Sequence, residues 1–431
     1  MVTEIIQQIT VVNEGHSFVA DVVIEDEIIK HIFEGEEESR LKQEEEIYPD
    51  VITDGKGCIL IPGVIDEHVH FREPGLTHKA SIASESRKAV AGGVTTFMDM
   101  PNCIPQTTTL DLLEQKYEIA AKCSPANYSF YLGATNENIA EIEALDPLAN
   151  CGVKVFMGSS TGGMLLDSDA MLEKVFKHSN VPIALHCEDQ RIISENIRIF
   201  KEKYGEDPDV RFHPLIRSEE ACYRSSARAV ELAERTGADI HILHISTKRE
   251  LNLFQAGDIA HKHITAEACI AHLLYSDADY STFGTAIKCN PAIKTAEDRD
   301  ALRRAVCESV IDTVATDHAP HTPADKQGGA LKAASGIAIL PHSLTAMLQL
   351  VKEGVFSLYD VVRTMCHNPA LRYHVSKRGF IREGYKADLV MLRLNEKENY
   401  DISTVWVNGK QAYANGIVNE NVRGQRLTFD R

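Results

Sequence analysis

The sequence of 431 residues lacks the features that mark membrane and secreted proteins. It has no apolar run of about 20 residues, the length that a membrane-spanning helix needs. Its opening segment, MVTEIIQQIT, contains neither the basic stretch nor the apolar stretch of a secretory signal. These absences predict a cytoplasmic protein that does not act at a membrane.

Basic residues and disulfide motifs are scarce as well. There are 45 Lys and Arg against 63 Asp and Glu, which gives a net charge of −18. This surplus argues against nucleic acid as a partner, because phosphate groups are bound by cationic surfaces. The ten cysteines form no Cys-x-x-Cys pair, and most lie in apolar runs. We therefore expect reduced thiols in the core rather than disulfides.

Strand-like segments occupy both ends of the chain. Residues 21–35 and 387–394 are rich in apolar and β-branched residues, and 402–418 contains an Asn-Gly hairpin signal at 408–409. The acidic stretch at 36–46 is typical of an exposed loop. We expect a small β-sandwich domain formed by both termini, residues 1–58 and 378–431.

The middle of the chain alternates between apolar, β-branched runs and helical segments. The runs lie at 59–66, 93–100, 127–133, 152–157, 181–186, 239–245, 263–269 and 311–316. One helical segment, 110–122, places Leu110, Leu113, Tyr117 and Ala121 on one face, and another, 219–236, stops at Gly237. Eight strands separated by helices predict an α/β fold, a distorted (β/α)₈ TIM-type barrel over residues 59–377.

Polar residues suited to metal binding stand at the ends of several predicted strands. His68 and His70 are two apart, so both rings point to one side of an extended chain, and His186, His244 and Asp317 each end a later strand. The carboxyl ends of barrel strands meet at one mouth. Packing alone would leave these polar groups unpaired, at about 1–3 kcal/mol each. The pattern predicts a metal site.

A lysine lies inside one apolar run, CGVKVFMGSS (151–160). Lys154 would be a snorkelling side chain on an edge strand, but a central barrel strand gives it no route to solvent except the mouth. Burial lowers the pKa of a lysine and makes its amine nucleophilic. Such an amine can take up carbon dioxide as a carbamate, an anion able to bridge two metals.

Five stretches together carry a resemblance to a known family: HVHFREPG (68–75), GGVTTFMDMPN (92–102), LHISTK (243–248), KCNPAIK (288–294) and TDHAPH (316–321). In this order they resemble the dihydroorotase family of the amidohydrolase superfamily over essentially the whole chain. The resemblance implies a distorted barrel with a small β-domain from both termini. It also implies reversible interconversion of L-dihydroorotate and N-carbamoyl-L-aspartate, a step of pyrimidine biosynthesis.

The resemblance also implies a role for each matching residue. His68 and His70 would hold one Zn²⁺ and His186 and His244 a second, with carboxylated Lys154 and a hydroxide bridging them. Asp317 would bind metal and shuttle a proton. Arg72, Asn102 and His321 would bind the free carboxylate of the substrate. Asn290 would contact the substrate ring.

Two departures from the family pattern bear on these assignments. One branch replaces the lysine by a nearby aspartate, but residues 156–159 offer no carboxylate, and Asp167 is a poor substitute. Relatives often carry Pro-His-His where this chain has 270–272, Ile-Ala-His, which weakens any role for that loop. The Gly- and Ala-rich segment 326–336 has the composition of a loop that could close over substrate.

Several alternatives stay open on sequence. Allantoinases and dihydropyrimidinases (hydantoinases) share the barrel, the paired histidines and the bridging lysine. The set Arg72, Asn102 and His321 favours a substrate that carries a carboxylate. A catalytically silent relative that scaffolds a transferase such as aspartate transcarbamoylase would have lost metal ligands, whereas all six are present. A small-molecule substrate is the expected partner, and a homodimer is compatible with the sequence.

Overall fold

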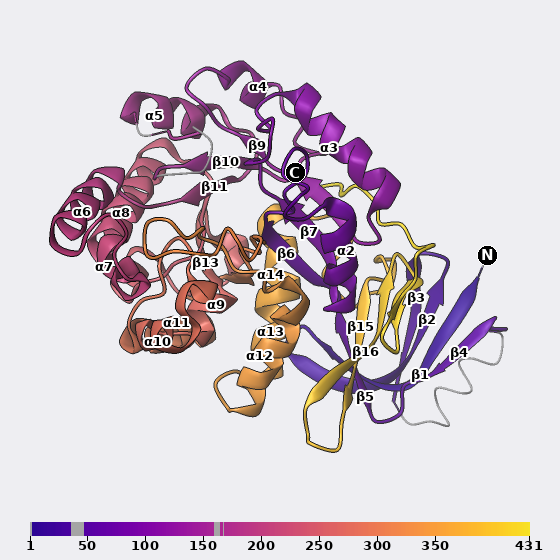
Figure 1. Ribbon diagram of the computed structural model, residues 1–431. Helices are drawn as coiled ribbons and strands as arrows, with labels where there is room; N and C mark the ends of the chain where they lie inside the picture. The colour runs from indigo at the N-terminus through magenta and orange to yellow at the C-terminus, as the bar shows by residue number, and fades with distance from the viewer. Residues whose placement is uncertain (1, 36–46, 159–163, 167) are drawn as a thin grey trace.

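The computed structural model describes residues 2–35, 47–158, 164–166 and 168–431 (Figure 1). The predicted acidic loop at 36–46, together with Ser159 and Asp167, lies outside the described residues. The fold is α/β, with a distorted barrel of parallel strands and a separate sheet built from both termini. No helix among the described residues has the length and apolar character needed to cross a membrane.

The barrel consists of parallel strands arranged in two hydrogen-bonded groups, β6-β7-β8 and β9-β10-β11-β12-β13-β14. Within the described chain they are β6 (Val64–Val69), β7 (Val94–Asp99), β8 (Asn127–Phe130), β9 (Leu132–Gly133), β10 (Val153–Phe156), β11 (Ile183–His186), β12 (Ile240–Ile242), β13 (Ile264–Cys269) and β14 (Thr313–Ala315). Strands β8 and β9 follow each other at one barrel position, and a bridge between Val69 and His318 closes the ring. Each of the eight predicted apolar runs contributes to this barrel.

Helices cover the outside of the barrel (Figure 1). They are α2 (Ile82–Ala91), α3 (Leu110–Cys123), α4 (Ile139–Glu143), α5 (Asp169–His178), α6 (Gln190–Tyr204), α7 (His213–Ile216), α8 (Glu219–Thr236), α9 (Ile270–Leu274), α10 (Tyr280–Phe283), α11 (Ala296–Cys307), α12 (Ser343–Lys352), α13 (Leu358–Val362) and α14 (Asn368–Tyr373). Between β12 and β13 the described chain has only short 3₁₀ turns, at Glu250–Leu253 and Ile259–His261, in place of an α-helix. This gap is one reason that the barrel is distorted.

Local sequence signals explain where the long helices begin and end. Helix α8 begins after Ser218, whose hydroxyl accepts a hydrogen bond from the Ala221 amide, and ends at Gly237 in the left-handed region (φ 72°), as predicted. In α3 the buried face contains Leu113, Tyr117 and Ala120. The predicted Ala121 is exposed, because a period of 3.6 residues returns to the same face after seven positions, not eight.

The second sheet combines strands from both ends of the chain in the order β18-β17-β16-β15-β5-β1-β2-β3, with β4 paired to β1. Its strands are β1 (Thr3–Asn13), β2 (His16–Glu25), β3 (Ile28–Glu34), β4 (Val51–Asp54), β5 (Cys58–Pro62), β15 (Leu389–Leu394), β16 (Tyr400–Val407), β17 (Lys410–Ala414) and β18 (Ile417–Val418). The Trp406 indole on β16 donates to Glu4 on β1 at 3.0 Å, although β15 and β5 lie between these strands. The sheet therefore folds onto itself around its own core, which gives the predicted sandwich.

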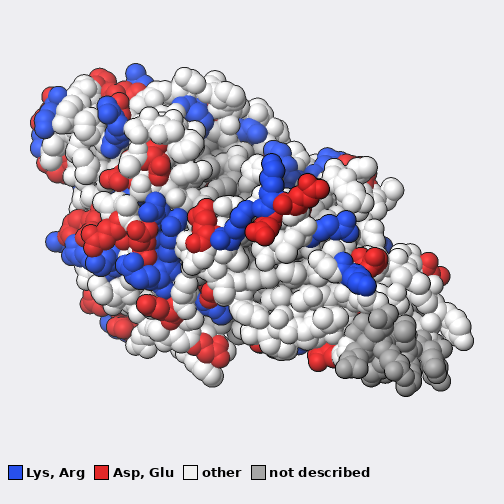
Figure 2. Space-filling view, turned by 90° about the horizontal axis from the view of Figure 1, so that it is seen from below, with Lys and Arg blue, Asp and Glu red and all other residues white. Residues whose placement is uncertain are grey.

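The chain passes from this sheet into the barrel at Gly63, between β5 and β6. A Cβ atom at this position would lie 2.1 Å from Thr95 Oγ1, so only glycine fits. On the face shown in Figure 2, acidic and basic residues are interspersed and do not form a broad patch of one sign. All ten cysteines are free thiols and eight of them are buried, as the sequence predicts.

Candidate active site

A cavity of about 450 Å³ opens at the carboxyl ends of the barrel strands. All ten residues predicted to bind metal or substrate line it: His68, His70, Arg72, Asn102, Lys154, His186, His244, Asn290, Asp317 and His321. They come from seven strand ends or the loops that follow them, so the barrel topology brings together residues as far apart as 68 and 321.

One group of possible metal ligands forms around Asp317. The Nε2 atoms of His68 and His70 lie 3.3 Å and 3.0 Å from Asp317 Oδ1. Burial acts to raise the pKa of Asp317, but the two imidazoles beside it lower that pKa well below its ordinary value. The carboxylate is therefore ionised at neutral pH and available as a ligand or proton acceptor.

A second group contains His186, the last residue of β11, and His244, two residues beyond the end of the neighbouring strand β12. His186 Nδ1 lies 2.9 Å from His244 Nε2, and the two rings meet edge to face. Burial lowers the pKa of His186 and lowers that of His244 further, with the neighbouring His186 as the next cause for His244. Both rings are therefore neutral at pH 7, the form that binds a metal.

The two groups fit divalent metal ions of the zinc type. Two ligands that are each about 2.1 Å from zinc at a tetrahedral angle lie roughly 3.4 Å apart. The distances of 3.3 Å and 3.0 Å at Asp317 are close to this spacing, and the 2.9 Å between His186 and His244 needs only a small opening. In addition, His244 Nδ1 is buried with no hydrogen-bond partner among the described residues, so no contact at Nδ1 opposes a move of the ring hydrogen from Nε2 to Nδ1 when a metal binds Nε2.

Lys154 lies on β10, fully buried, with its amine 4.8 Å from the centre of the Phe156 ring. Burial lowers its pKa to about 8, although the carboxylates of Asp317 and Glu267 act in the opposite direction. Burial is the main reason that the pKa values of His186 and His244 are lowered, and the charge of Lys154 lowers them as well. Lys154 is thus close to both ligand groups, and its amine is partly neutral at physiological pH.

The backbone is strained at three of these strand ends. Arg72, His244 and Asp317 have φ angles of 69°, 42° and 47°, in the left-handed region that L-residues rarely adopt. Strand β6 ends at Val69, so Arg72 reaches the cavity through this turn and not by continuing the strand alternation of His68 and His70. Such strain persists where the surrounding structure fixes it, and it clusters at functional sites.

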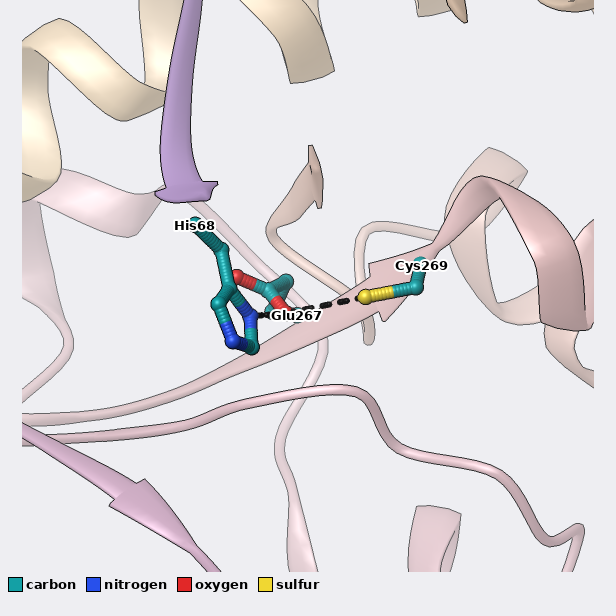
Figure 3. Close-up of side chains that lie close together, drawn as sticks. All are labelled: His68, Glu267 and Cys269. Atoms are coloured by element: carbon teal, nitrogen blue, oxygen red, sulfur yellow. Dashed lines mark hydrogen bonds and ion pairs between the residues drawn. The ribbon is translucent and has the colours of Figure 1, made fainter. Parts of the chain in front are cut away.

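Glu267 was not identified from the sequence, yet it organises the first ligand group. Its Oε1 atom lies 2.9 Å from His68 Nδ1 and 3.3 Å from Cys269 Sγ (Figure 3). The same oxygen accepts the backbone N–H of His244 at 2.9 Å. A carboxylate that holds one ring nitrogen fixes the other toward a metal. The only sequence signal was a glutamate inside the apolar run 263–269.

Glu188 has the same relation to the second group. It is fully buried, with Oε2 3.0 Å from His186 Nε2, and it pairs with Arg217. Burial acts to raise the pKa of Glu188, but Arg217 and His186 lower it to about 2. Glu188 follows His186 by two residues, and that spacing was the available signal.

The predicted substrate residues form one wall of the cavity. Arg72 donates from Nε to the Pro320 carbonyl at 3.0 Å, and its Nη2 lies 3.1 Å from His321 Nε2. Burial, together with the Arg72 and Lys79 charges, lowers the pKa of His321 to about 4. The wall therefore combines a permanent cation with a neutral imidazole, and Lys79 Nζ lies 3.2 Å from His321 Nδ1.

Asn102 and Asn290 have further contacts that the sequence did not predict. Asn102 Oδ1 lies 2.6 Å from His70 Nδ1, so this amide orients a predicted metal ligand. Asn290 Oδ1 lies 3.1 Å from His213 Nε2, a ring that also lines the cavity. In the loop 270–272, where the sequence departs from the family pattern, His272 Nε2 lies 3.0 Å from the Pro291 carbonyl oxygen.

The segment predicted as a candidate lid, 326–336, borders the cavity through residues 330–336. Asp207 fixes it by accepting the backbone N–H groups of Gly329 (2.7 Å), Leu331 and Lys332 (both 3.0 Å). The Lys326 amine donates to three backbone carbonyls, two of them within the segment, at 2.8–3.1 Å. Two side chains therefore hold this border of the cavity in place.

Comparison with known proteins shows which family has this fold and this set of residues. Residues 59–412 match the model of the amidohydrolase family. A dihydroorotase of Methanosphaera stadtmanae is 31% identical, covering 91% of this chain and 88% of its own. An allantoinase of Bacillus velezensis is 30% identical over 89% of this chain and 83% of its own. The solved L-hydantoinase (dihydropyrimidinase) of Arthrobacter aurescens superposes with a TM-score of 0.91 at 25% identity, covering 99% and 100% of the two chains. The protein therefore belongs to the amidohydrolase family.

Proposed function

We propose that this chain is a dihydroorotase, which interconverts L-dihydroorotate and N-carbamoyl-L-aspartate with two Zn²⁺ ions. The observation that carries the proposal is the wall formed by Arg72 and His321, 3.1 Å apart and on the same cavity as both ligand groups. Dihydroorotate has a carboxylate on its ring, whereas allantoin, hydantoin and dihydrouracil lack one. A buried guanidinium suits such a group, because its fork can bind both oxygens at once.

The ligand groups support two metal positions. His68 and His70 would hold one ion together with Asp317, and His186 and His244 would hold the other. Carboxylated Lys154 would lie between them, since its amine is close to both groups and partly neutral. When bound, such ions supply an acidic water and polarise the amide carbonyl.

The chain's own side chains would perform the proton transfer. Asp317 is ionised, so an oxygen of its carboxylate would accept the proton of the attacking water and return it to the ring nitrogen that leaves. Arg72, Asn102 and His321 would orient the ring by its carboxylate, and Asn290 would contact the ring itself. In the reverse direction, Asp317 would take the proton from the carbamoyl nitrogen as the ring closes.

The proposal includes a location in the cytoplasm and a small-molecule substrate. Ten free thiols suit the reducing cytoplasm, where pyrimidine synthesis supplies a small-molecule substrate. We also propose a homodimer as the working form. Analytical ultracentrifugation of the purified chain tests this last point.

A substrate comparison tests the main proposal. One preparation is assayed with L-dihydroorotate, allantoin, hydantoin and dihydrouracil at equal concentration. We expect efficient ring opening of L-dihydroorotate and turnover of the other three at least ~100-fold lower, the effect of losing a buried charge partner. Efficient turnover of allantoin or hydantoin would instead assign the chain to the activities named for those relatives. Absence of any turnover with bound metal would favour the silent scaffold.

A further inference from the structure

A second cluster of metal-type side chains lies inside the barrel, separate from the ligand groups at the mouth. Glu67 on β6, His241 on β12 and Glu267 on β13 are all 0% exposed. One ligand atom from each lies within 4.8 Å of the others. His241 lies within β12, whereas His244 lies two residues beyond the end of that strand, so the cluster lies deeper in the barrel than the mouth.

The hydrogen bonds of His241 determine which of its ring nitrogens faces the cluster as an acceptor. Thr265 Oγ1 donates its proton to the Ile240 carbonyl at 3.2 Å, and His241 Nδ1 lies 2.8 Å from the same hydroxyl oxygen. The hydroxyl therefore accepts from His241, which places the hydrogen of the neutral ring on Nδ1. His241 Nε2 then presents a lone pair to the two carboxylates, 3.9 Å from Glu67 and 4.0 Å from Glu267.

The cluster has more acceptors than donors. Both oxygens of Glu67 and Oε2 of Glu267 are buried with no hydrogen-bond partner among the described residues. Thr313 Oγ1, 3.3 Å from His241 Nε2, has one proton and can satisfy a single acceptor. An unpaired buried polar atom costs about 1–3 kcal/mol, and a charged one costs more. A cation among these atoms would remove that cost.

We propose that Glu67, His241 and Glu267 bind a third divalent metal ion, of the zinc type, inside the barrel. Two zinc ligands at a tetrahedral angle lie roughly 3.4 Å apart, and the Glu67 and Glu267 oxygens lie 3.9 Å and 4.0 Å from His241 Nε2. The three side chains would therefore close on the ion by about 0.5 Å. Imidazole and carboxylate are ligands that zinc accepts. Glu267 would join this ion to the mouth, since its other oxygen holds His68 at 2.9 Å.

Because its site is buried, the proposed ion should resist a chelator, unlike the two ions proposed at the solvent-accessible cavity. All three ligand residues are 0% exposed, so the ion can leave only when the barrel opens. Dialysis of the full-length protein against a chelator should remove ions from the solvent-accessible cavity and leave about one equivalent of zinc per chain. Unfolding in guanidinium should release that remainder. This fraction does not depend on turnover, so it is measured whether or not the proposed function holds.

The experiment combines metal analysis with diffraction. The protein is expressed with added zinc, treated with chelator, and analysed for zinc, and crystals of it are examined by anomalous scattering at the zinc edge. We expect a peak among Glu67, His241 and Glu267, which Glu67→Gln removes. The matched control is Glu250→Gln, a buried glutamate whose oxygens accept from Ser226 (2.6 Å) and Thr247 (2.9 Å), and it should retain the peak.

A wild-type crystal with no peak at this position, before and after chelation, would overturn the proposal. The carboxylates and the imidazole would then share protons instead of a metal. If Glu67→Gln fails to fold, the wild-type peak and the chelator-resistant zinc decide the question alone.

Discussion

His186 Nδ1 lies 2.9 Å from His244 Nε2, so ring nitrogens at the ends of two neighbouring strands face each other. Glu188 lies 3.0 Å from His186 Nε2 and favours a proton there, which leaves Nδ1 as an acceptor. In the metal-free chain a hydrogen on His244 Nε2 fills the space between the rings. A metal ion at this position would replace that single hydrogen.

This arrangement predicts that Glu188 strengthens metal binding without being a ligand. Glu188→Gln keeps the shape but removes the charge that orients His186, so zinc affinity should fall about 10–100-fold, the usual effect of such outer partners. Competition with a fluorescent chelator measures the affinity. Glu195→Gln, on the exposed face of α6, is the control and should bind zinc as the natural chain does. Equal affinity in both variants would contradict the role given to Glu188.

The predicted carboxylate contact gives a second test, at Arg72. Replacing this buried guanidinium by Met removes the charge but keeps much of the volume. We expect kcat/KM for L-dihydroorotate to fall by about 2–4 kcal/mol in transition-state free energy, roughly 30- to 1,000-fold. Arg87→Met removes an exposed guanidinium paired with Glu420 and should leave kcat/KM unchanged. An effect of the same size on dihydrouracil would show that Arg72 does not act through the carboxylate.

Lys154 separates a metal bridge from simple packing. Lys154→Ala should lose about half of the bound zinc at the mouth and most of the activity, and short carboxylic acids added to the buffer should restore part of both. Lys154→Arg should not recover activity, because a guanidinium stays cationic and repels the metal ions. Zinc content and turnover are measured for each variant. If Arg or Met at this position retains both zinc and turnover, Lys154 is a packing residue.

Most of the fold and of the site residues could be predicted because each depends on local pattern and on one topological rule. Continuous apolar runs located all the barrel strands, and the rule that strand ends converge was enough to place His68 near Asp317. The helical face of α3 was wrong by one position at its end, where a short pattern does not distinguish Ala120 from Ala121. The strained turn at Arg72 was also missed, because sequence gives little warning of a positive φ at arginine.

The supporting carboxylates could not be predicted, since their importance depends on three-dimensional neighbours. Glu267 and Glu188 each contact a histidine of another element or of their own loop, and nothing in their sequence context states which ring they meet. Asp99 is a further example. It accepts the Phe71 N–H at 2.7 Å, between His70 and Arg72, and pairs with buried Lys116 at 2.5 Å. A charge inside an apolar run was visible for Glu267 and Asp99, and the two-residue spacing from His186 was visible for Glu188, but the partner of each carboxylate was not.

The contacts of Asp207 predict its effect on the cavity border. Asp207→Ala removes the acceptor of three N–H groups in the segment 326–336, so residues 330–336 should become more mobile. We expect KM for L-dihydroorotate to rise several-fold with zinc content unchanged, because the metal groups lie on other elements. Hydrogen exchange of the segment reports the mobility. Asp209→Ala, an exposed neighbour that pairs with Arg211, is the control. Unchanged hydrogen exchange in Asp207→Ala would show that Asp207 does not hold the segment 326–336 in place.

The pKa of Lys154 predicts how the metal-free protein is reactivated as pH changes. Burial lowers this pKa to about 8, so the amine is mostly protonated at pH 6 and mostly neutral above pH 8. Only the neutral amine can attack carbon dioxide: the nitrogen forms a bond to carbon, one C=O bond becomes C–O⁻, and the nitrogen loses a proton. At constant dissolved carbon dioxide and zinc, the initial rate of reactivation should rise about tenfold per pH unit below pH 7 and level off above pH 8. Carbon dioxide, not bicarbonate, must be held constant, because its share of total carbonate falls as pH rises. A rate that is flat across this range would show that carboxylation of Lys154 does not limit assembly of the site, and reactivation without any carbon dioxide would refute the carbamate.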